Sequence, residues 1–366
     1  MSDPTFMAQA LALAALGEGT TRPNPLVGCV IVKDGAVVGH GFHRAAGEPH
    51  AEALALAEAG AHARGATLYV NLEPCAHHGR TAPCVEAIVR AGVLRVVAAV
   101  GDPNPLVDGR GLAALRSAGI AVTAGVLESE ARGLNAPFLS THERARPFVT
   151  LKAAQSLDGR IAAGGGSSTW ITGEASRRYA HRLRFRHDAV LVGAGTVRRD
   201  DPRLTVRLPG VDAVRRRVVL APRLALDSRA KVFVPEAPSA PRTRVYVGAG
   251  CAEAEKARFG AVAEIVTVAD GADGLDLPAV LADLRRAGVQ AVLVEGGGKT
   301  SGAFLRAGLV DEIVLFIALR LIGSGGATPV IDFPAVSDPG KAWRVAPAAF
   351  IPMGGDLVVV GRPGAP

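Results

Sequence analysis

The first third of the chain alternates short apolar runs with segments rich in helix-forming residues. The apolar runs predict strands at 26–32, 36–41, 67–72, 94–100 and 120–122. The segments between them predict helices over 1–16, from Pro49 to Gly60, from Pro83 to Gly92, and over 111–118. The turn Lys33-Asp34-Gly35 predicts that the first two strands form a hairpin. Strands alternating with helices in this way predict an α/β layered domain.

The same alternation continues through the second half of the chain. Strand candidates lie at 148–154, 189–193, 218–220, 245–247, 265–268, 289–295, 313–317 and 357–360. The stretch 127–147 contains Asn135-Ala136-Pro137 and a charged run, which is typical of a connection. A chain of 366 residues exceeds one typical domain. We therefore expect two α/β domains, at 1–146 and 147–366.

The composition indicates the cellular compartment in which we expect the protein. The hydrophobic fraction of 49% is ordinary for packed cores, and the four cysteines are too few for a disulfide framework. No apolar run reaches the roughly 18 residues that a membrane span needs. The first 16 residues lack a basic start and a cleavage site, so they predict a helix rather than an export signal. We expect a cytoplasmic protein.

The net charge of +7 raises the question of nucleic-acid binding. Aromatic residues make up only 4% of the chain, which is few for base stacking, and the arginine clusters lie in the second half. Arginines at 177–186 and 198–207 could instead bind phosphate groups of small molecules, although most are expected on a solvated face. We expect a small phosphorylated substrate, no nucleic-acid or membrane partner, and a homo-oligomer.

One imidazole and two thiols have the spacing of a catalytic zinc site. His50, Cys75 and Cys84 would supply three ligands and leave a fourth position for water, whereas a structural site would need a fourth His or Cys. Glu52 follows the histidine by two residues, as does the glutamate that carries protons in zinc nucleobase deaminases. The sequence therefore predicts that this chain activates water.

The spacing of His50 and Glu52 requires a helix start, because residues two apart inside a helix point to different faces. Pro49 suits a first helical turn, and Pro83 similarly places Cys84 at a helix start that favours a thiolate. Alternatively, single cysteines of this kind are buried packing residues, as we expect for Cys29 and Cys251.

Two glycine-rich turns are candidates for binding phosphate. The turn from Glu295 to Ser301 leaves an apolar strand and enters a helix, so its backbone N–H groups could face a phosphate. A plain flexible turn is the alternative. The turn Gly193-Ala194-Gly195-Thr196 also follows a strand, but Arg198 replaces the third glycine of a dinucleotide fingerprint.

Distinctive motifs stand in both halves. The first half contains Pro23-Asn24-Pro25-Leu26-Val27-Gly28, Gly47-Glu48-Pro49-His50-Ala51-Glu52, Leu72-Glu73-Pro74-Cys75-Ala76-His77-His78-Gly79-Arg80-Thr81 and Asp102-Pro103-Asn104-Pro105. The second half contains Lys152-Ala153-Ala154-Gln155-Ser156-Leu157-Asp158-Gly159, Ser168-Thr169-Trp170-Ile171-Thr172-Gly173, Asp200-Asp201-Pro202-Arg203-Leu204-Thr205-Val206-Arg207 and Glu295-Gly296-Gly297 leading to Gly308-Leu309-Val310-Asp311-Glu312. Nearly end to end, these motifs resemble the bifunctional riboflavin-biosynthesis proteins, which join a pyrimidine deaminase to a reductase. The eight-residue gap between Cys75 and Cys84 favours this family over deaminases with Cys-x-x-Cys.

The resemblance implies a cytidine-deaminase-like α/β/α domain followed by a dihydrofolate-reductase-like α/β domain. In the first, it implies zinc on His50, Cys75 and Cys84, with Glu52 as the proton carrier. It further implies that the deaminase substrate is held by Asn24, His43, Arg80, Asp102 and Asn104.

For the second domain, the resemblance implies NADPH as the cofactor. The implied cofactor contacts are Ala154, Trp170, Thr196, Asp200 and the turn Gly297, Gly298, Lys299, Thr300, Ser301, Gly302 and Ala303. The implied substrate contacts are Ser168, Arg184, Leu204, Arg207 and Glu295. Without the resemblance, Trp170 could equally be a core residue and Glu295 a surface charge.

The chain departs from the family at one strand end. Relatives usually have Leu/Ile-Asp-Ser where this chain has Leu220-Ala221-Pro222, which removes a hydroxyl and a backbone N–H from the adenine side of the cofactor site.

The resemblance therefore implies two consecutive reactions on one phosphorylated intermediate. Deamination of a diaminopyrimidinone ribosyl phosphate would be followed by hydride transfer to C1′ of an open-chain ribose imine. Lys152 and Asp200 are the candidates for protonation and positioning, and Arg184 and Arg207 for binding the 5′-phosphate. Two rival hypotheses are a nucleic-acid editing deaminase, which would bind single strands in a strongly salt-dependent way, and a non-catalytic module that uses zinc for folding.

Overall fold

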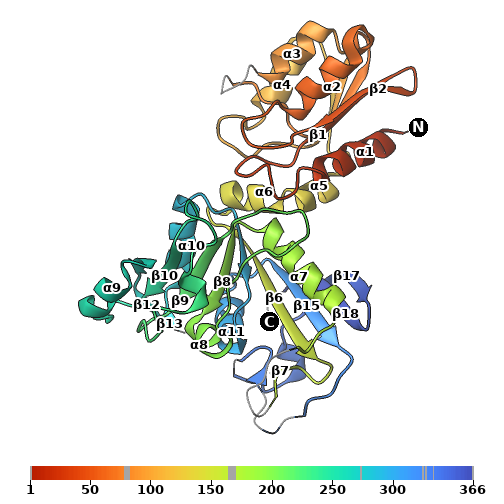
Figure 1. Ribbon diagram of the computed structural model, residues 1–366. Coiled ribbons are helices and arrows are strands. Elements are labelled where there is room, and N and C mark those ends of the chain that lie inside the picture. Colours follow the sequence, from red (N-terminus) through yellow and green to blue (C-terminus); the bar gives the residue numbers. More distant parts are fainter. Residues whose placement is uncertain are drawn as a thin grey trace. The chain divides into compact units, whose positions relative to one another are not determined.

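The computed structural model describes residues 2–77, 83–163, 170–272, 274–323, 325, 328–332 and 334–364. The chain divides into two compact units, Met1–Arg146 and Pro147–Pro366 (Figure 1).

The first unit contains a five-stranded sheet with the order β2-β1-β3-β4-β5. Its elements are α1 (Asp3–Ala15), β1 (Gly28–Lys33), β2 (Ala36–Phe42), α2 (Ala51–Ala59), the 3-10 turn η1 (Gly60–Ala63), β3 (Thr67–Leu72), α3 (Cys84–Ala91), β4 (Arg95–Val100), α4 (Arg110–Ser117), β5 (Ala121–Ala124), α5 (Glu128–Leu134) and α6 (Ala136–Glu143). Strand β1 is antiparallel to β2 and β3, while β3, β4 and β5 are parallel. The predicted hairpin at 33–35 is confirmed.

Alternate residues of the sheet pack against helices on opposite faces. Cys29 and Ile31 belong to a buried cluster with α2, α3 and α4, whereas Val30 and Val32 belong to a second cluster with α1, α5 and α6. The sheet is therefore the middle of three layers, as the resemblance implied.

The stretch 127–147 is not the plain connection that the sequence predicted. It forms α5 and α6, which belong to the first unit. Ala131, Phe138 and Leu139 are buried against the sheet. The Pro137 that suggested a break lies in the first turn of α6, where the missing N–H costs no hydrogen bond.

The second unit contains a nine-stranded sheet with the order β11-β10-β9-β8-β14-β6-β15-β18-β17. Its helices are α7 (Glu174–Arg186), α8 (Ala194–Asp200), α9 (Glu253–Phe259), α10 (Leu277–Arg286) and α11 (Gly298–Arg306), with 3-10 turns η2 (Lys231–Phe233) and η3 (Pro339–Lys341). Its strands are β6 (Phe148–Ser156), β7 (Arg160–Ala162), β8 (Ala189–Gly193), β9 (Arg216–Leu220), β10 (Thr243–Val247), β11 (Ala263–Thr267), β12 (Asp270–Gly271), β13 (Gly274–Leu275), β14 (Ala291–Val294), β15 (Glu312–Ala318), β16 (Thr328–Pro329), β17 (Val345–Met353) and β18 (Asp356–Pro363).

From β11 to β15 the strands of the large sheet are parallel, and the hairpin β17-β18 extends it in antiparallel fashion. Because β8, β9 and β14 are parallel, their carboxyl ends meet at one edge of the sheet, where α8 and α11 begin. The α/β architecture predicted for both halves is confirmed. The sequence did not predict β17, which contains Pro347 and Pro352 and lies at the sheet edge, where prolines are tolerated.

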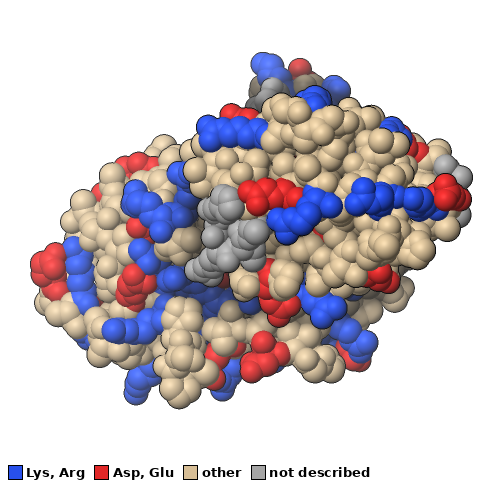
Figure 2. Space-filling view, turned by 90° about the horizontal axis from the view of Figure 1, so that it is seen from above, with Lys and Arg blue, Asp and Glu red and all other residues tan. Residues whose placement is uncertain are grey.

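Surface charge on the visible face is mixed. Figure 2 shows acidic side chains lying among the basic ones rather than a continuous basic surface on that face. Among the described residues, none of the helices combines the length and hydrophobicity needed to cross a bilayer.

Candidate functional site

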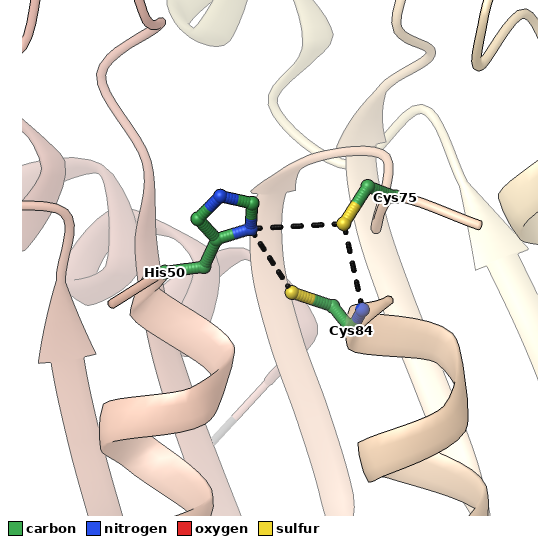
Figure 3. A group of neighbouring side chains, drawn as sticks. All are labelled: His50, Cys75 and Cys84. Carbon is green, nitrogen blue, oxygen red and sulfur yellow. Dashed lines mark hydrogen bonds between the residues drawn. The ribbon is translucent and has the colours of Figure 1, made fainter. Parts of the chain in front are cut away.

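The His50 and cysteine side chains of the first unit converge from three separate elements. His50 is the extended residue just before α2, Cys75 follows β3, and Cys84 is the first residue of α3. The His50 imidazole and both thiols point toward one another (Figure 3). The two helix starts that the prolines predicted therefore bring together ligands that are 34 residues apart in sequence.

The distances between these side chains suit a tetrahedral ion. His50 Nδ1 lies 3.2 Å from Cys84 Sγ and 3.6 Å from Cys75 Sγ, and all three ligand atoms lie within 4.8 Å of one another. A zinc ion with Zn–N near 2.0 Å and Zn–S near 2.3 Å separates its ligand atoms by about 3.5–3.8 Å. One imidazole with two thiols is also a donor set that zinc prefers. The residues present fit the metal.

Glu52 is buried in the first turn of α2, with an exposed fraction of 3%. Burial raises the pKa of this carboxyl. The Cys75 thiol has a lowered pKa, because Cys84 and His50 both hydrogen-bond to its sulfur. Of the two sulfurs, Cys84 is buried like Glu52, whereas Cys75 is half-buried.

Asn24 and His43 form a chain of hydrogen bonds beside His50. Asn24 Nδ2 lies 3.0 Å from His43 Nε2, and His43 Nδ1 lies 3.1 Å from the carbonyl of Pro49. The His43 and His50 rings meet edge to face, with centroids 5.7 Å apart. Burial lowers the pKa of His43, which favours a neutral ring that donates from Nδ1 to Pro49 and accepts from Asn24.

Asp102 and Asn104 lie on a loop that Glu73 holds in place. The Asp102 and Gly109 amides donate to one Glu73 oxygen at 3.2 and 3.1 Å. The Gly111 and Leu112 amides donate to the other at 2.8 and 3.1 Å. Asp102 is nearly buried, and burial raises its pKa to about 6. The sequence marked Glu73 only as part of a motif, because its partners follow 29 or more residues later.

Two asparagines that the sequence did not single out fix the segment after Asn24. Leu26 N donates to Asn135 Oδ1 at 2.8 Å, and Asn135 and Asn71 each donate to Leu26 O at 2.9 Å. Both asparagines are buried. Arg80 and Ser168, which the sequence suggested as substrate contacts, lie outside the described residues.

In the second unit, a buried ion pair brings together three predicted residues. Val294 pairs with Leu151, so Glu295 comes level with Lys152 on the neighbouring strand. Arg184 of α7 binds both oxygens of Glu295, at 2.7 and 2.8 Å, and donates to the Thr205 carbonyl at 2.9 Å.

Charge and burial oppose one another in this group. Burial would raise the pKa of Glu295, but the positive charges of Arg184 and Lys152 outweigh it and hold the pKa at about 2. Burial lowers the pKa of Lys152. Glu295 is thus a buried carboxylate and not the surface charge that was the alternative.

Arg207 and Leu204 lie on the segment that this ion pair supports. The Arg207 amide donates to His181 Nδ1 at 3.3 Å, and burial together with Arg184 and Arg207 lowers the pKa of His181 to about 4. Leu204 has φ of +57° and its side chain is buried in the core. Only the backbone of Leu204 could therefore face a ligand here. His181 was not predicted from the sequence.

A cleft of about 370 Å³ opens at the carboxyl ends of β8, β9 and β14. The predicted cofactor residues that line it are Thr196, Gly297, Gly298, Lys299, Thr300 and Ala303. A methyl group on Gly193 would lie 2.5 Å from Thr300 Oγ1, so glycine allows α11 to approach this close. The residues present form a glycine-lined cleft at a helix start, which fits the pyrophosphate of a dinucleotide.

The other predicted cofactor residues are not among those that line this cleft. Ser301 and Gly302 are buried within α11. Ala154 lies on β6, Trp170 is 64% exposed with Arg177 over its ring, and Asp200 is exposed at the end of α8. Trp170 is therefore not a core residue.

Family models match both halves of the chain. The model described as cytidine and deoxycytidylate deaminase zinc-binding region matches residues 1–100, and the RibD C-terminal domain matches residues 147–349.

Whole-chain comparisons give the same result. The riboflavin biosynthesis protein RibD of Aquifex aeolicus (strain VF5) is 47% identical over 358 residues, which cover 98% of this chain and 97% of that protein. RibD of Escherichia coli (strain K12) is 43% identical, covering 88% and 89%. A structure of Acinetobacter baumannii RibD has a TM-score of 0.88 at 40% identity, with 99% of each chain covered. The deaminase/reductase structure from Thermotoga maritima has a TM-score of 0.84 at 36% identity, also covering 99% of each. The chain therefore belongs to the RibD family of riboflavin-biosynthesis proteins.

Proposed function

We propose that this chain catalyses two consecutive steps of riboflavin biosynthesis. The first is hydrolytic deamination of 2,5-diamino-6-(ribosylamino)-4(3H)-pyrimidinone 5′-phosphate, performed by residues 1–146. The second is NADPH-dependent reduction of the ribosyl group to a ribityl side chain, performed by residues 147–366. The main support is the convergence of His50, Cys75 and Cys84 beside buried Glu52, in a chain similar to RibD proteins over nearly its whole length.

In the first reaction, His50, Cys75 and Cys84 would hold zinc, and the bound metal would lower the pKa of water toward neutrality and so provide a nucleophile. Glu52 takes a proton from the attacking water and delivers protons to the ring nitrogen and the departing amine. A C–O bond forms at the amine-bearing carbon, the C–N bond breaks, and ammonia leaves. Burial suits Glu52 to this role because a raised pKa brings a carboxyl closer to working pH.

Residues around the metal ligands position the pyrimidine. Asn24, His43, Asp102 and Asn104, together with Arg80, bind the substrate in this proposal. The orientation of the His43 ring is fixed by two hydrogen bonds, one that Nδ1 donates to the Pro49 carbonyl and one that Nε2 accepts from Asn24 Nδ2. Glu73 accepts a hydrogen bond from the Asp102 amide, so Asp102 is held in position before the substrate binds.

In the second reaction, NADPH held by the second unit would supply the hydride needed to reduce C1′ of the open-chain imine. The cofactor contacts are Ala154, Trp170, Thr196, Asp200 and residues 297–303. Lys152 delivers the proton that accompanies the hydride, since burial lowers the pKa of its ammonium group. Asp200 assists positioning, and Ser168, Leu204, Arg207 and the Arg184–Glu295 pair bind the substrate, with Arg207 and Arg184 nearest its phosphate.

An assay that separates ammonia release from NADPH oxidation tests both steps. The diaminopyrimidinone substrate should release ammonia without cofactor and should oxidise NADPH only after deamination. Glu52→Gln should lower ammonia release by about 10²-fold or more while zinc content stays unchanged. The control is Glu58→Gln, an exposed carboxylate on the same helix that pairs with His40. Normal deamination by Glu52→Gln would refute the proton role.

The reductase assignment has its own test. Lys152→Ala and Asp200→Asn, assayed with the deaminated intermediate, should each slow NADPH oxidation and leave ammonia release unchanged. If neither substitution slowed reduction, the assigned roles of Lys152 and Asp200 in the reductase reaction would be wrong.

We further propose that the chain works in the cytoplasm as a homo-oligomer and does not bind nucleic acid. Light scattering at several protein concentrations tests the assembly. Titration with single-stranded DNA at low and high salt tests the last point, because phosphate contacts would make binding steeply salt-dependent.

A further inference from the structure

Cationic and apolar side chains line the same cleft in the second unit. Arg198, Arg199 and Lys299 line it together with Leu220, Pro222 and Leu275. Apolar side chains flanking a slot suit a flat heterocycle, and guanidinium groups suit a phosphate. The cleft therefore has the chemistry of an adenosine phosphate site.

The strand order gives the cleft a direction, provided that NADPH binds here as proposed above. Strands follow one another as β9-β8-β14-β6. Lys152 and Glu295, where substrate is reduced, belong to β6 and the end of β14. The nicotinamide must reach toward them, so the adenosine lies toward β9 (Figure 1). Leu220 is the last residue of β9, Pro222 follows it, and both line the cleft.

The end of β9 offers little polar chemistry to an adenosine ribose. Pro222 has no backbone N–H, and the Ala221 amide already donates to the Tyr246 carbonyl at 2.9 Å. Neither side chain carries a hydroxyl. Hydrogen bonds to a phosphate at this end must therefore come from another element, and α8 presents two arginines to the same cleft.

The cationic side chains of the cleft differ in whether they already form hydrogen bonds within the protein. Arg198 Nη1 is tied to the Ala225 carbonyl at 3.1 Å. Lys299 lies in the first turn of α11, next to the glycines proposed to face the pyrophosphate. Within the described part of the chain, the Arg199 guanidinium has no ion-pair or hydrogen-bond partner, and the residue is exposed. Arg199 thus keeps all its donors for a ligand.

We propose that Arg199 binds the 2′-phosphate of the adenosine ribose and so makes this chain select NADPH over NADH. Leu220, Pro222 and Leu275 hold the adenine. A planar guanidinium can form two parallel charge-assisted hydrogen bonds with a phosphate, and NADH offers only a hydroxyl at that position. The selectivity residue comes from the helix because the strand end Leu220-Ala221-Pro222 lacks the groups for it.

Equilibrium binding tests this proposal without any chemical step. We would titrate the protein calorimetrically with NADPH, NADH, 2′,5′-ADP and 5′-AMP. The native chain should bind 2′,5′-ADP at least about tenfold more tightly than 5′-AMP, since hydrogen bonds between charged groups are worth more than the 1.4 kcal/mol of a tenfold change. Arg199→Ala should weaken NADPH and 2′,5′-ADP by about tenfold and leave NADH and 5′-AMP within about twofold.

Control variants separate Arg199 from general charge effects. Arg286→Ala removes an exposed arginine of α10 and should leave all four affinities unchanged. Arg199→Lys should retain part of the preference. Unaltered selectivity in Arg199→Ala, or its loss in Arg198→Ala alone, would overturn the assignment while the reductase proposal stands. If the native chain bound neither NADPH nor NADH, the proposed reductase function would itself fail.

Discussion

Gly111 and Glu73 are in direct contact in the first unit. The Gly111 amide donates to Glu73 Oε1 at 2.8 Å, and a methyl group on Gly111 would lie 1.9 Å from the Pro74 carbonyl oxygen. With the amides of Asp102, Gly109 and Leu112 on the same carboxylate, four N–H groups surround one acid. A buried carboxylate therefore ties the loop of Asp102 to the residues just before Cys75.

We expect Glu73→Gln to destabilise the first unit by about 3 kcal/mol, because an amide offers one acceptor oxygen and leaves buried N–H groups without a partner. Circular dichroism during denaturation would measure the change. Both tryptophans, Trp170 and Trp343, belong to the second unit, so their fluorescence should be unaffected. Glu128→Gln, at an exposed side chain of α5, is the matched control and should be nearly neutral. Equal stability of the two variants would contradict the anchoring role.

Gly111→Ala should also be strongly destabilising, by about 3 kcal/mol or more, because the new methyl group meets the Pro74 backbone. Ammonia release should fall with it, while reduction of the deaminated intermediate should not. Gly133→Ala is the control in α5, where a methyl group meets nothing within 4 Å. That change should stabilise by about 0.5–1 kcal/mol. A neutral Gly111→Ala would show that the helix start can move away.

Breaking the Arg184–Glu295 pair from one side should cost about 3–5 kcal/mol, because one buried charge is left without its partner. The side chains are only 14% and 8% exposed. Arg184→Met and Glu295→Gln together should cost less than the sum of the two changes. Urea unfolding followed by tryptophan fluorescence measures this coupling. The exposed pair Arg178–Glu174 of the same helix, changed in the same way, should show at most about 0.5 kcal/mol. Additive costs at the buried pair would contradict the interaction.

His181 should make the second unit sensitive to acid. Its pKa is lowered from an ordinary 6.5 to about 4, mainly by burial, so the unfolded chain binds the proton more readily. The resulting stability is complete above pH 6.5 and is lost as the pH falls through 4. His181→Gln should therefore flatten the pH dependence of unfolding between pH 6.5 and 4. His62→Gln, on the surface of the first unit, should leave it unchanged, and an identical slope in both variants would argue against the shift.

Cysteine substitutions should separate metal binding from packing. Cys75→Ser or Cys84→Ser should lower bound zinc and abolish ammonia release, because a serine hydroxyl is a poor zinc ligand. Cys251→Ser, at a buried thiol of the second unit, should keep its zinc. Metal analysis of the purified variants decides this. Full zinc content in both Cys75→Ser and Cys84→Ser would exclude them as ligands.

Local signals were enough to predict much of the fold and the convergence of the zinc ligands. The prolines and helix formers place Ala51 and Cys84 at helix starts, and the apolar runs identify the strands of the first sheet. These features depend on neighbours within one turn or one strand. For the same reason the spacing of His50 and Glu52 was interpretable before the structure.

Contacts between segments that are distant in the chain could not be predicted from local sequence patterns. Nothing near Glu73 indicates the amides of 102–112, and nothing near Leu26 indicates Asn135, which is 109 residues away. The charged run after Pro137 concealed α6, whose buried side is only Phe138, Leu139 and Ser140. In β17, two prolines obscured a strand whose edge position leaves their missing N–H groups harmless.

The two asparagines that bracket Leu26 have a practical consequence for anyone who shortens this protein. A fragment that ends at residue 126, just before α5, would keep every candidate zinc ligand. It would lose Asn135, whose side-chain amide accepts a hydrogen bond from Leu26 N and donates one to Leu26 O. Such a fragment should still take up metal, but the Asn24 side chain would no longer be held opposite His43. Deamination would thus depend on a residue between α5 and α6 that contributes no metal ligand.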